Sequence, residues 1–182
     1  MTSFISHLVG TAKTSGVLGG LLLALTVASP ALAAPPERES TRLEFAIVTS
    51  EDVNPDPKAR PSPIEIRIYE LKNPQAFEQA DYQSLSQKDA ETLGGDLLRK
   101  DGFILRPGER RDIDRKSDAE TTAIGVLAGY RELGKTIWRV VYRLEEAPET
   151  AWYRKLIPNQ KARLDIRLDA LGVQIKDRDK TP

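Results

Sequence analysis

The sequence contains no cysteine, and its single histidine, His7, lies within the first ten residues. A chain without cysteine can form no disulfide framework and can do no thiolate chemistry. Beyond His7 the chain lacks the side chains whose pKa values are most easily placed near neutrality for acid–base catalysis. The usual ligands of zinc and other transition metals are missing for the same reason. We therefore expect no enzyme acting on a small-molecule substrate, no metal and no cofactor.

The sequence also has no excess of either charge, with 27 Lys and Arg against 27 Asp and Glu. Such a balance supplies no field that would attract nucleic acid or an anionic membrane surface. A chain of 182 residues fits one domain once a targeting segment is removed. A domain of that size buries enough surface to fold without disulfides.

The first 33 residues have the features of an export signal. Lys13 supplies positive charge, residues 17–28 form a short apolar run, and Pro30 breaks the run ahead of an Ala-Leu-Ala motif at 31–33. The run is too short for a membrane span, which needs about 20 apolar residues. We predict a cleavable signal peptide over 1–33 and an exported protein, with an uncleaved anchor as the alternative. Cleavage removes only Lys13 among the charged residues and leaves 26 basic against 27 acidic side chains.

Alternation of apolar and polar residues predicts half-buried strands in the rest of the chain. The clearest lies over 64–71, where Ile64, Ile66 and Ile68 share one face. Asn73 and Pro74 are typical of a helix start and predict short helices over 75–80 and 82–93. Further strands are expected over 41–49, 96–100, 103–106, 110–114, 123–133, 136–144, 163–168 and 173–175.

Turns are expected between these strands at Asp101-Gly102, at Arg106-Pro107-Gly108-Glu109, at Gly134-Lys135 and at Gly172. About eight short strands with one helical insertion, and no βα repeat, predict an all-β, antiparallel β-sandwich. We expect a flexible tether over 34–40, the sandwich domain over 41–176 and a charged tail over 177–182.

One long connection stands out, because residues 50–63 contain Pro55, Pro57, Pro61 and Pro63. Proline fixes φ and donates no ladder hydrogen bond, so the segment is predicted to be an ordered loop and not a strand. Loops of this length in compact domains are usually functional or disordered.

Two weaker patterns suggest other chemistry. Asp112, Asp114 and Asp118 resemble part of a calcium loop, but basic residues interleave with them, and the glycine and glutamate that such a loop needs are absent. Trp152 and Tyr153 in a second long loop are compatible with a sugar-stacking platform, although covering a sheet edge explains them better. A solvated charged face and a core-covering aromatic pair are therefore the preferred interpretations.

Several segments taken together resemble the TssJ/VasD (SciN) family of the type VI secretion system. They are RPSPIEIRIYELKNPQAFEQADYQSL at 60–85, LGGDLL at 93–98, RPGE at 106–109, GVLAGYREL at 125–133 and Trp138-Arg139. The resemblance covers residues 43–175. No single segment is a catalytic motif, so the order and spacing of the segments carry the resemblance.

The resemblance implies a transthyretin-like β-sandwich in the periplasm, associated with the outer membrane through its partners. It also implies binding to the periplasmic C-terminal domain of TssM, and through it to TssL. In that family the loop between the first two strands contacts TssM. The matching residues here are Asn54, Pro55, Asp56, Pro57, Lys58, Ala59, Arg60, Pro61 and Ser62. The resemblance therefore implies a structural component of the trans-envelope membrane complex.

One departure concerns membrane attachment. Members of the family usually carry a lipobox cysteine at the cleavage point, whereas Pro35 stands there in this sequence. We therefore expect cleavage after Ala33 and no direct lipid anchor. The alternative functions are a periplasmic carbohydrate-binding or adhesion module, and a transthyretin-like hydrolase such as hydroxyisourate hydrolase, whose catalytic histidines are missing here.

Overall fold

The computed structural model describes residues 40–145 and 161–180. Within these ranges the strands are β1 (Arg42–Thr49), β2 (Ile64–Leu71), β3 (Leu97–Leu105), β4 (Arg110–Lys116), β5 (Ala123–Ala128), β6 (Arg139–Arg143), β7 (Lys161–Leu168) and β8 (Val173–Asp177). The helical segments are α1 (Gln75–Gln79), α2 (Tyr82–Gln87), α3 (Asp89–Leu93) and the 3-10 turn η1 (Gly94–Asp96).

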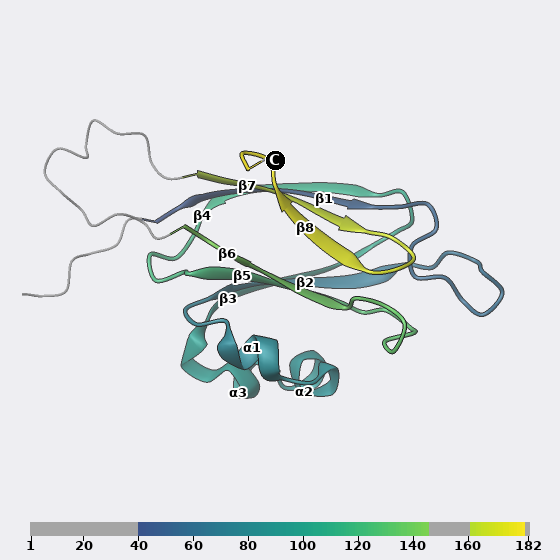
Figure 1. The fold of residues 1–182 in the computed structure, drawn as a ribbon, viewed down its shortest axis with the longest axis horizontal. Coiled ribbons are helices and arrows are strands. Elements are labelled where there is room, and N and C mark those ends of the chain that lie inside the picture. The colour runs from purple at the N-terminus through teal and green to yellow at the C-terminus, as the bar shows by residue number, and fades with distance from the viewer. Residues whose placement is uncertain (1–39, 146–160, 181–182) are drawn as a thin grey trace, which may run out of the picture. The chain divides into compact units, whose positions relative to one another are not determined.

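The strands form two four-stranded sheets that face each other (Figure 1). The strand order is β4-β1-β7-β8 in the first sheet and β3-β2-β5-β6 in the second. Every pair is antiparallel except β1 and β7, which run parallel. The predicted β-sandwich with a helical insertion is therefore confirmed, with one parallel pair that the sequence did not indicate.

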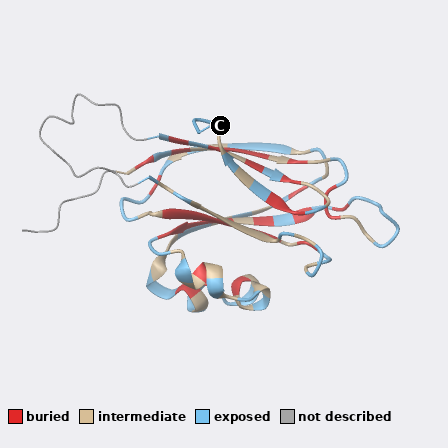
Figure 2. Ribbon diagram, viewed as in Figure 1, coloured by how far each residue is buried: buried red, intermediate tan, exposed pale blue. Residues whose placement is uncertain are grey.

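The core lies between the two sheets, where buried residues line the facing sides (Figure 2). The alternation predicted for β2 is correct, because Ile64, Ile66 and Ile68 all point into this core. Burying each such side chain contributes about 1.5–3 kcal/mol of transfer free energy. The other strands supply Leu43, Phe45, Ile47, Leu105, Ile124, Val126, Leu164, Ile166, Leu168 and Val173.

A second apolar cluster lies on the outer side of the β3-β2-β5-β6 sheet, under the three helices. Phe77 of α1 is buried against Tyr69 of β2, with ring centroids 5.3 Å apart. Leu85 and Leu93 from α2 and α3 complete the cover. Residues of β2 and β5 are therefore buried on both faces of the sheet, which the sequence pattern alone did not indicate.

Some predicted boundaries differ from the structure. Asp101 and Gly102 do not form a turn but lie inside β3, paired with Ile68 and Arg67 of β2. Their turn-forming composition is outweighed by the ladder on β2 and by an ion pair between Asp101 and Arg115 of β4. The predicted helix over 82–93 is divided at Lys88, whose backbone leaves the helical region.

On the side of the sandwich formed by β3 and β4, an ion pair links the two sheets. Arg115 of β4 lies 2.8 Å from the carboxylate of Glu70 on β2, and the Glu70 side chain is fully buried. The second carboxylate oxygen of Glu70 accepts hydrogen bonds from the Asp118 amide and the Thr121 hydroxyl. Removing one member of such a buried pair is costly because the other charge stays uncompensated.

Candidate partner-binding site

The predicted binding residues lie in the connection that leaves β1 in one sheet and enters β2 in the other. This connection projects past the ends of the strands (Figure 1). All nine predicted residues, 54–62, belong to the described part of the chain. Pro57, Lys58, Ala59, Arg60 and Pro61 are exposed, so the projecting tip presents them to solvent.

The tip is closed into a compact turn by Asp56. One carboxylate oxygen accepts the backbone amides of Lys58 and Arg60, each at 2.9 Å. The other lies 2.8 Å from Nε of Arg60 and 2.6 Å from its terminal nitrogen. The hydrogen bond from the Arg60 side chain lowers the pKa of Asp56, so the carboxylate stays ionised near neutral pH.

The backbone of the tip is held in an uncommon conformation. Ala59 has φ of 58°, and its amide donates to the Asp56 carbonyl at 2.8 Å. A left-handed conformation at a residue other than glycine costs about 1–3 kcal/mol and persists only where its surroundings enforce it. Backbones strained in this way cluster at functional sites, so the tip differs from an ordinary connection.

The base of the loop is anchored in the sandwich. The buried Asn54 side chain donates to the Pro63 carbonyl at 3.0 Å and accepts the Arg131 amide at 2.9 Å. Val53 is fully buried in the core, and the Ser62 amide donates to its carbonyl at 3.1 Å. Asn54 and Ser62 therefore lie beneath the exposed tip, where they can position it.

Three other connections are hydrogen-bonded to this loop or to one another at the same end of the sandwich. In the β3–β4 turn, the Gly108 amide donates to the carbonyl of Ser50, the first residue of the loop, at 3.2 Å. In the β5–β6 connection, Arg131 contacts Asn54, and the Tyr130 hydroxyl donates to Asp169 of the β7–β8 turn at 3.0 Å. Burial raises the pKa of the Tyr130 phenol, which therefore stays a donor.

Two residues at this end were not predicted as part of the site. Ile137, just before β6, is 59% exposed, and Leu171, in the β7–β8 turn, is 74% exposed. The sequence predicted a strand over 136–144, so Ile137 was not recognised as an exposed residue. The sequence also did not indicate that the backbones of Ile137 and Leu171 are hydrogen-bonded to each other. The only sequence feature that could have indicated an exposed apolar residue here is the position of Leu171 directly before the turn residue Gly172.

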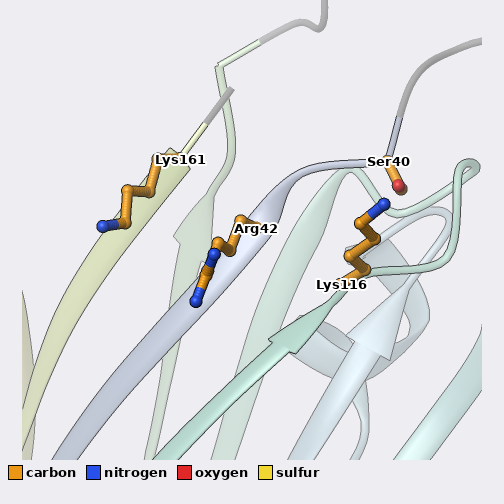
Figure 3. Close-up of a pocket in the computed structure, with 4 residues that line it drawn as sticks. All are labelled: Ser40, Arg42, Lys116 and Lys161. Carbon is orange, nitrogen blue, oxygen red and sulfur yellow. The ribbon is translucent and has the colours of Figure 1, made fainter. Parts of the chain in front are cut away.

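A shallow groove lies where β1 and β7 begin and β4 ends, lined by Ser40, Arg42, Lys116 and Lys161 (Figure 3). Its positive charge is largely compensated, because Arg42 forms a two-point pair with Asp114 and Lys161 lies 2.5 Å from Glu44. The groove therefore offers little free charge for an anionic ligand.

The other candidate sites receive no support from the described residues. Asp112 pairs with Arg110, and Asp118 accepts the Glu120 amide, so the suggested calcium ligands are used locally. Across residues 40–145 and 161–180 no three acidic or histidine side chains are grouped as metal ligands would be. Over the same ranges no helix is long and apolar enough to cross a membrane. Trp152 and Tyr153 lie outside the described residues.

Comparison with known proteins gives a family and a set of similar structures. A family model described as type VI secretion lipoprotein, VasD, EvfM, TssJ, matches residues 41–171. The crystal structure of the type VI secretion lipoprotein TssJ1 from Pseudomonas aeruginosa is 36% identical, with a TM-score of 0.66. The match covers 81% of this chain and all of that chain. No curated protein matches the chain in sequence.

Two further matches come from structures of components of the same secretion system. A chain in a type VI membrane complex is 26% identical, with a TM-score of 0.61 over 76% of this chain and 99% of that chain. A chain in the structure described as the TssM C-terminal domain from EAEC is also 26% identical, with a TM-score of 0.58. That match covers 76% of this chain and 98% of the other.

Proposed function

Because this chain belongs to the family of type VI secretion lipoproteins that includes VasD, EvfM and TssJ, we propose that it works by binding the periplasmic C-terminal domain of TssM. The role is structural: the protein joins the trans-envelope complex through TssM, and TssM in turn connects it to TssL. A relative with the same fold occurs in the structure described as the TssM C-terminal domain, which supports this partner.

The observation that carries the proposal is the braced, exposed tip of the β1–β2 loop. Asp56 holds the tip in one conformation, and four prolines limit the freedom of the unbound loop. A loop that is already ordered loses less conformational entropy on docking. The exposed cations Lys58 and Arg60 can orient an acidic partner surface, and the apolar rings of Pro57 and Pro61 can pack against it.

The direct test replaces residues 56–60 by a Gly/Ser segment of equal length. We expect the affinity for the purified TssM C-terminal domain to fall at least about tenfold, because both the exposed charges and the brace are lost. Isothermal titration calorimetry measures the affinity, and thermal unfolding checks that the sandwich remains folded. Undiminished binding by the folded variant would place the interface elsewhere.

A pair of single substitutions separates the loop from general charge effects. Lys58→Ala removes an exposed cation at the tip, and Lys116→Ala removes an exposed cation at the other end of the sandwich. Both change the net charge equally, so long-range attraction changes to a similar extent. The proposal requires that only Lys58→Ala weakens binding.

A further inference from the structure

One face of the sandwich carries no cover. The helices lie on the outer side of the β3-β2-β5-β6 sheet, and none of the described elements lies on the outer side of the β4-β1-β7-β8 sheet (Figure 1). Side chains alternate along a strand, and Leu43, Phe45 and Ile47 of β1 point into the core. Arg42 and Glu44 therefore point to the outer side, the bare sheet face, which is a flat surface of strand residues.

Basic residues outnumber acidic ones on the bare sheet face. Every second residue of each strand points to it, and the pairing register places these residues side by side across the sheet. Its basic residues are Arg42, Arg110, Lys116, Lys161, Arg163, Arg167 and Lys176, and its acidic residues are Glu44, Asp112, Asp114 and Asp165. The face therefore has an excess of positive charge, although the whole chain has as many acidic as basic residues.

The acidic residues of the bare sheet face are already neutralised by ion pairs. The pairs are Asp114 with Arg42, Glu44 with Lys161, Asp112 with Arg110 and Asp165 with Arg178, and Arg163 pairs with Asp179 beyond the end of β8. Lys116, Arg167 and Lys176, in contrast, are exposed and form no ion pair with any described residue. These three cations lie on β4, β7 and β8, so the uncompensated charge extends from one edge of the sheet to the other.

The helical layer on the opposite side of the sandwich, residues 75–96, carries the opposite charge (Figure 1). Its acidic residues are Glu78, Asp81, Asp89, Glu91 and Asp96, and its only basic residue is Lys88. Glu78 and Asp89 pair with basic residues of β6 and β3. Hydrogen bonds from the Ser84 amide and hydroxyl lower the pKa of Asp81, which therefore stays ionised. Asp81, Glu91 and Asp96 remain at the surface with only Lys88, 3.9 Å from Glu91, to balance them.

We propose that the bare sheet face of one copy of this chain binds the helical layer of a second copy. Surfaces of opposite charge attract and orient each other on association. Two copies meet no long-range repulsion, because the chain has 27 basic and 27 acidic residues. The two surfaces lie on opposite sides of each molecule, so the copies associate head to tail and form a ring or a row.

This association leaves the β1–β2 loop free. The loop projects past the ends of the strands, whereas the bare sheet face and the helical layer form the two flat sides of the sandwich (Figure 1). A copy that is bound on both flat sides therefore still presents its loop. The inference does not rest on the proposed function, and its failure would leave that function untouched.

The experiment measures the mass of the purified mature chain (residues 34–182) by light scattering over a range of protein concentrations. At about 0.01 M salt the mass should rise above that of one chain, because charges act over about 30 Å, and at about 1 M salt it should return to one chain. Arg167→Glu combined with Lys176→Glu reverses the charge of the bare sheet face and should weaken association at least about tenfold. Glu91→Lys combined with Asp96→Lys reverses the charge of the helical layer and should have the same effect.

Two further measurements separate the contact from general charge effects. Arg106→Glu combined with Lys135→Glu is the matched control, because it changes the net charge as the sheet variant does but alters exposed residues on connections outside both surfaces. This control should associate like the wild type. An equal mixture of the sheet variant and the helical variant should associate again, because the unchanged helical layer of the first fits the unchanged sheet face of the second. Thermal unfolding checks that each variant is folded.

Three results would overturn the inference. The first is a wild type that stays monomeric at low salt, and the second is a mixture of the two variants that does not associate. The third is a control variant that loses association as completely as the sheet variant. If the wild type is monomeric but sediments with vesicles of phosphatidylcholine and phosphatidylglycerol, the bare sheet face binds an anionic membrane surface and not a second copy.

Discussion

Asp89 is a nearly buried carboxylate that ties the helical insertion to the sheet. It accepts hydrogen bonds from the Lys100 ammonium at 2.8 Å and the Tyr69 hydroxyl at 3.1 Å. Its own helix α3 contributes the Ala90 amide at 2.8 Å. Burial opposes the charged form, but the bonds from Lys100 and Tyr69 outweigh it and lower the pKa of Asp89.

Asp89→Asn is expected to lower the free energy of unfolding by about 1–3 kcal/mol at pH 7, because buried hydrogen bonds to a charge are weakened. A carboxyl with a lowered folded pKa stabilises the protein above the unfolded pKa of about 3.9 and loses this effect as pH falls through the folded pKa. The difference between wild type and variant should therefore shrink below about pH 4. Urea unfolding at a series of pH values measures this difference in the free energy of unfolding.

Glu91→Gln is the control for Asp89, since Glu91 lies on the same helix and is exposed. It should alter stability by less than about 0.5 kcal/mol at any pH. If the difference in the free energy of unfolding between wild type and Asp89→Asn stays constant in acid, the charge of the Asp89 carboxylate is not the cause of the stabilisation.

For single residues, the sequence indicated which side chains of a strand face the core. It did not indicate the residues whose burial depends on contacts with segments far away in the sequence. Alternation placed Ile64, Ile66 and Ile68 in the core, because a strand has a period of two. It could not show that Tyr69 is buried on the opposite face, since that depends on helices placed there by tertiary packing. Ile137 and Leu171 meet through a similar long-range contact that no local pattern contains.

At the scale of helices and strands, the contact between α1 and β5 depends on Gly125, because a glycine has no side chain to keep α1 away from the sheet. A Cβ at Gly125 would lie 3.0 Å from the Phe77 ring and 3.1 Å from Leu71. The glycine therefore lets the Phe77 ring rest directly on the sheet and bury the outer face of β2. The helical insertion is packed on the sandwich through this contact.

Gly125→Ala is expected to destabilise the protein by about 1–3 kcal/mol, because overpacking pushes Phe77 away from the sheet. Gly95→Ala is a matched control, since a Cβ there meets nothing within 4 Å. It should be neutral or stabilise by up to about 1 kcal/mol, because it reduces the freedom of the unfolded chain. Chemical unfolding of both variants tests the packing, and equal effects would contradict it.

The sequence predicted most of the strands, helices and loops, but it did not predict the residues at which they begin and end. Prolines marked residues 50–63 as an ordered loop, and Gly108, with φ of 74°, confirms the turn predicted at 106–109. The Asp101-Gly102 sequence has the composition of a turn, yet it continues β3 because β2 offers a full ladder. Strand limits depend on the neighbouring strand, which a single sequence does not reveal.

For the molecule as a whole, the domain begins at the end away from the candidate site. The first described residue, Ser40, lies where β1 starts, and the β1–β2 loop begins where β1 ends (Figure 1). With about 3.3 Å per residue, eight residues of strand separate the two by about 26 Å. Any segment that precedes Ser40 therefore joins the domain far from the β1–β2 loop, where we propose that the partner binds.

We predict that the exported chain starts at Ala34 and carries no fatty acid, because the sequence has no cysteine to acylate. Mass spectrometry of protein purified from the periplasm should give the mass of residues 34–182. A diacylated N-terminus would contradict the prediction. An unprocessed chain that retains Lys13 would instead support the uncleaved anchor.

The position of β1 also determines how the domain responds to force. β1 is hydrogen-bonded on one side to β4 and on the other to β7 along its whole length. A pull between Ser40 and the β1–β2 loop runs along the backbone of β1, which is already extended, so covalent bonds carry the load and the rungs of the two ladders do not have to open. The domain therefore resists traction well along the line that joins Ser40 to this loop.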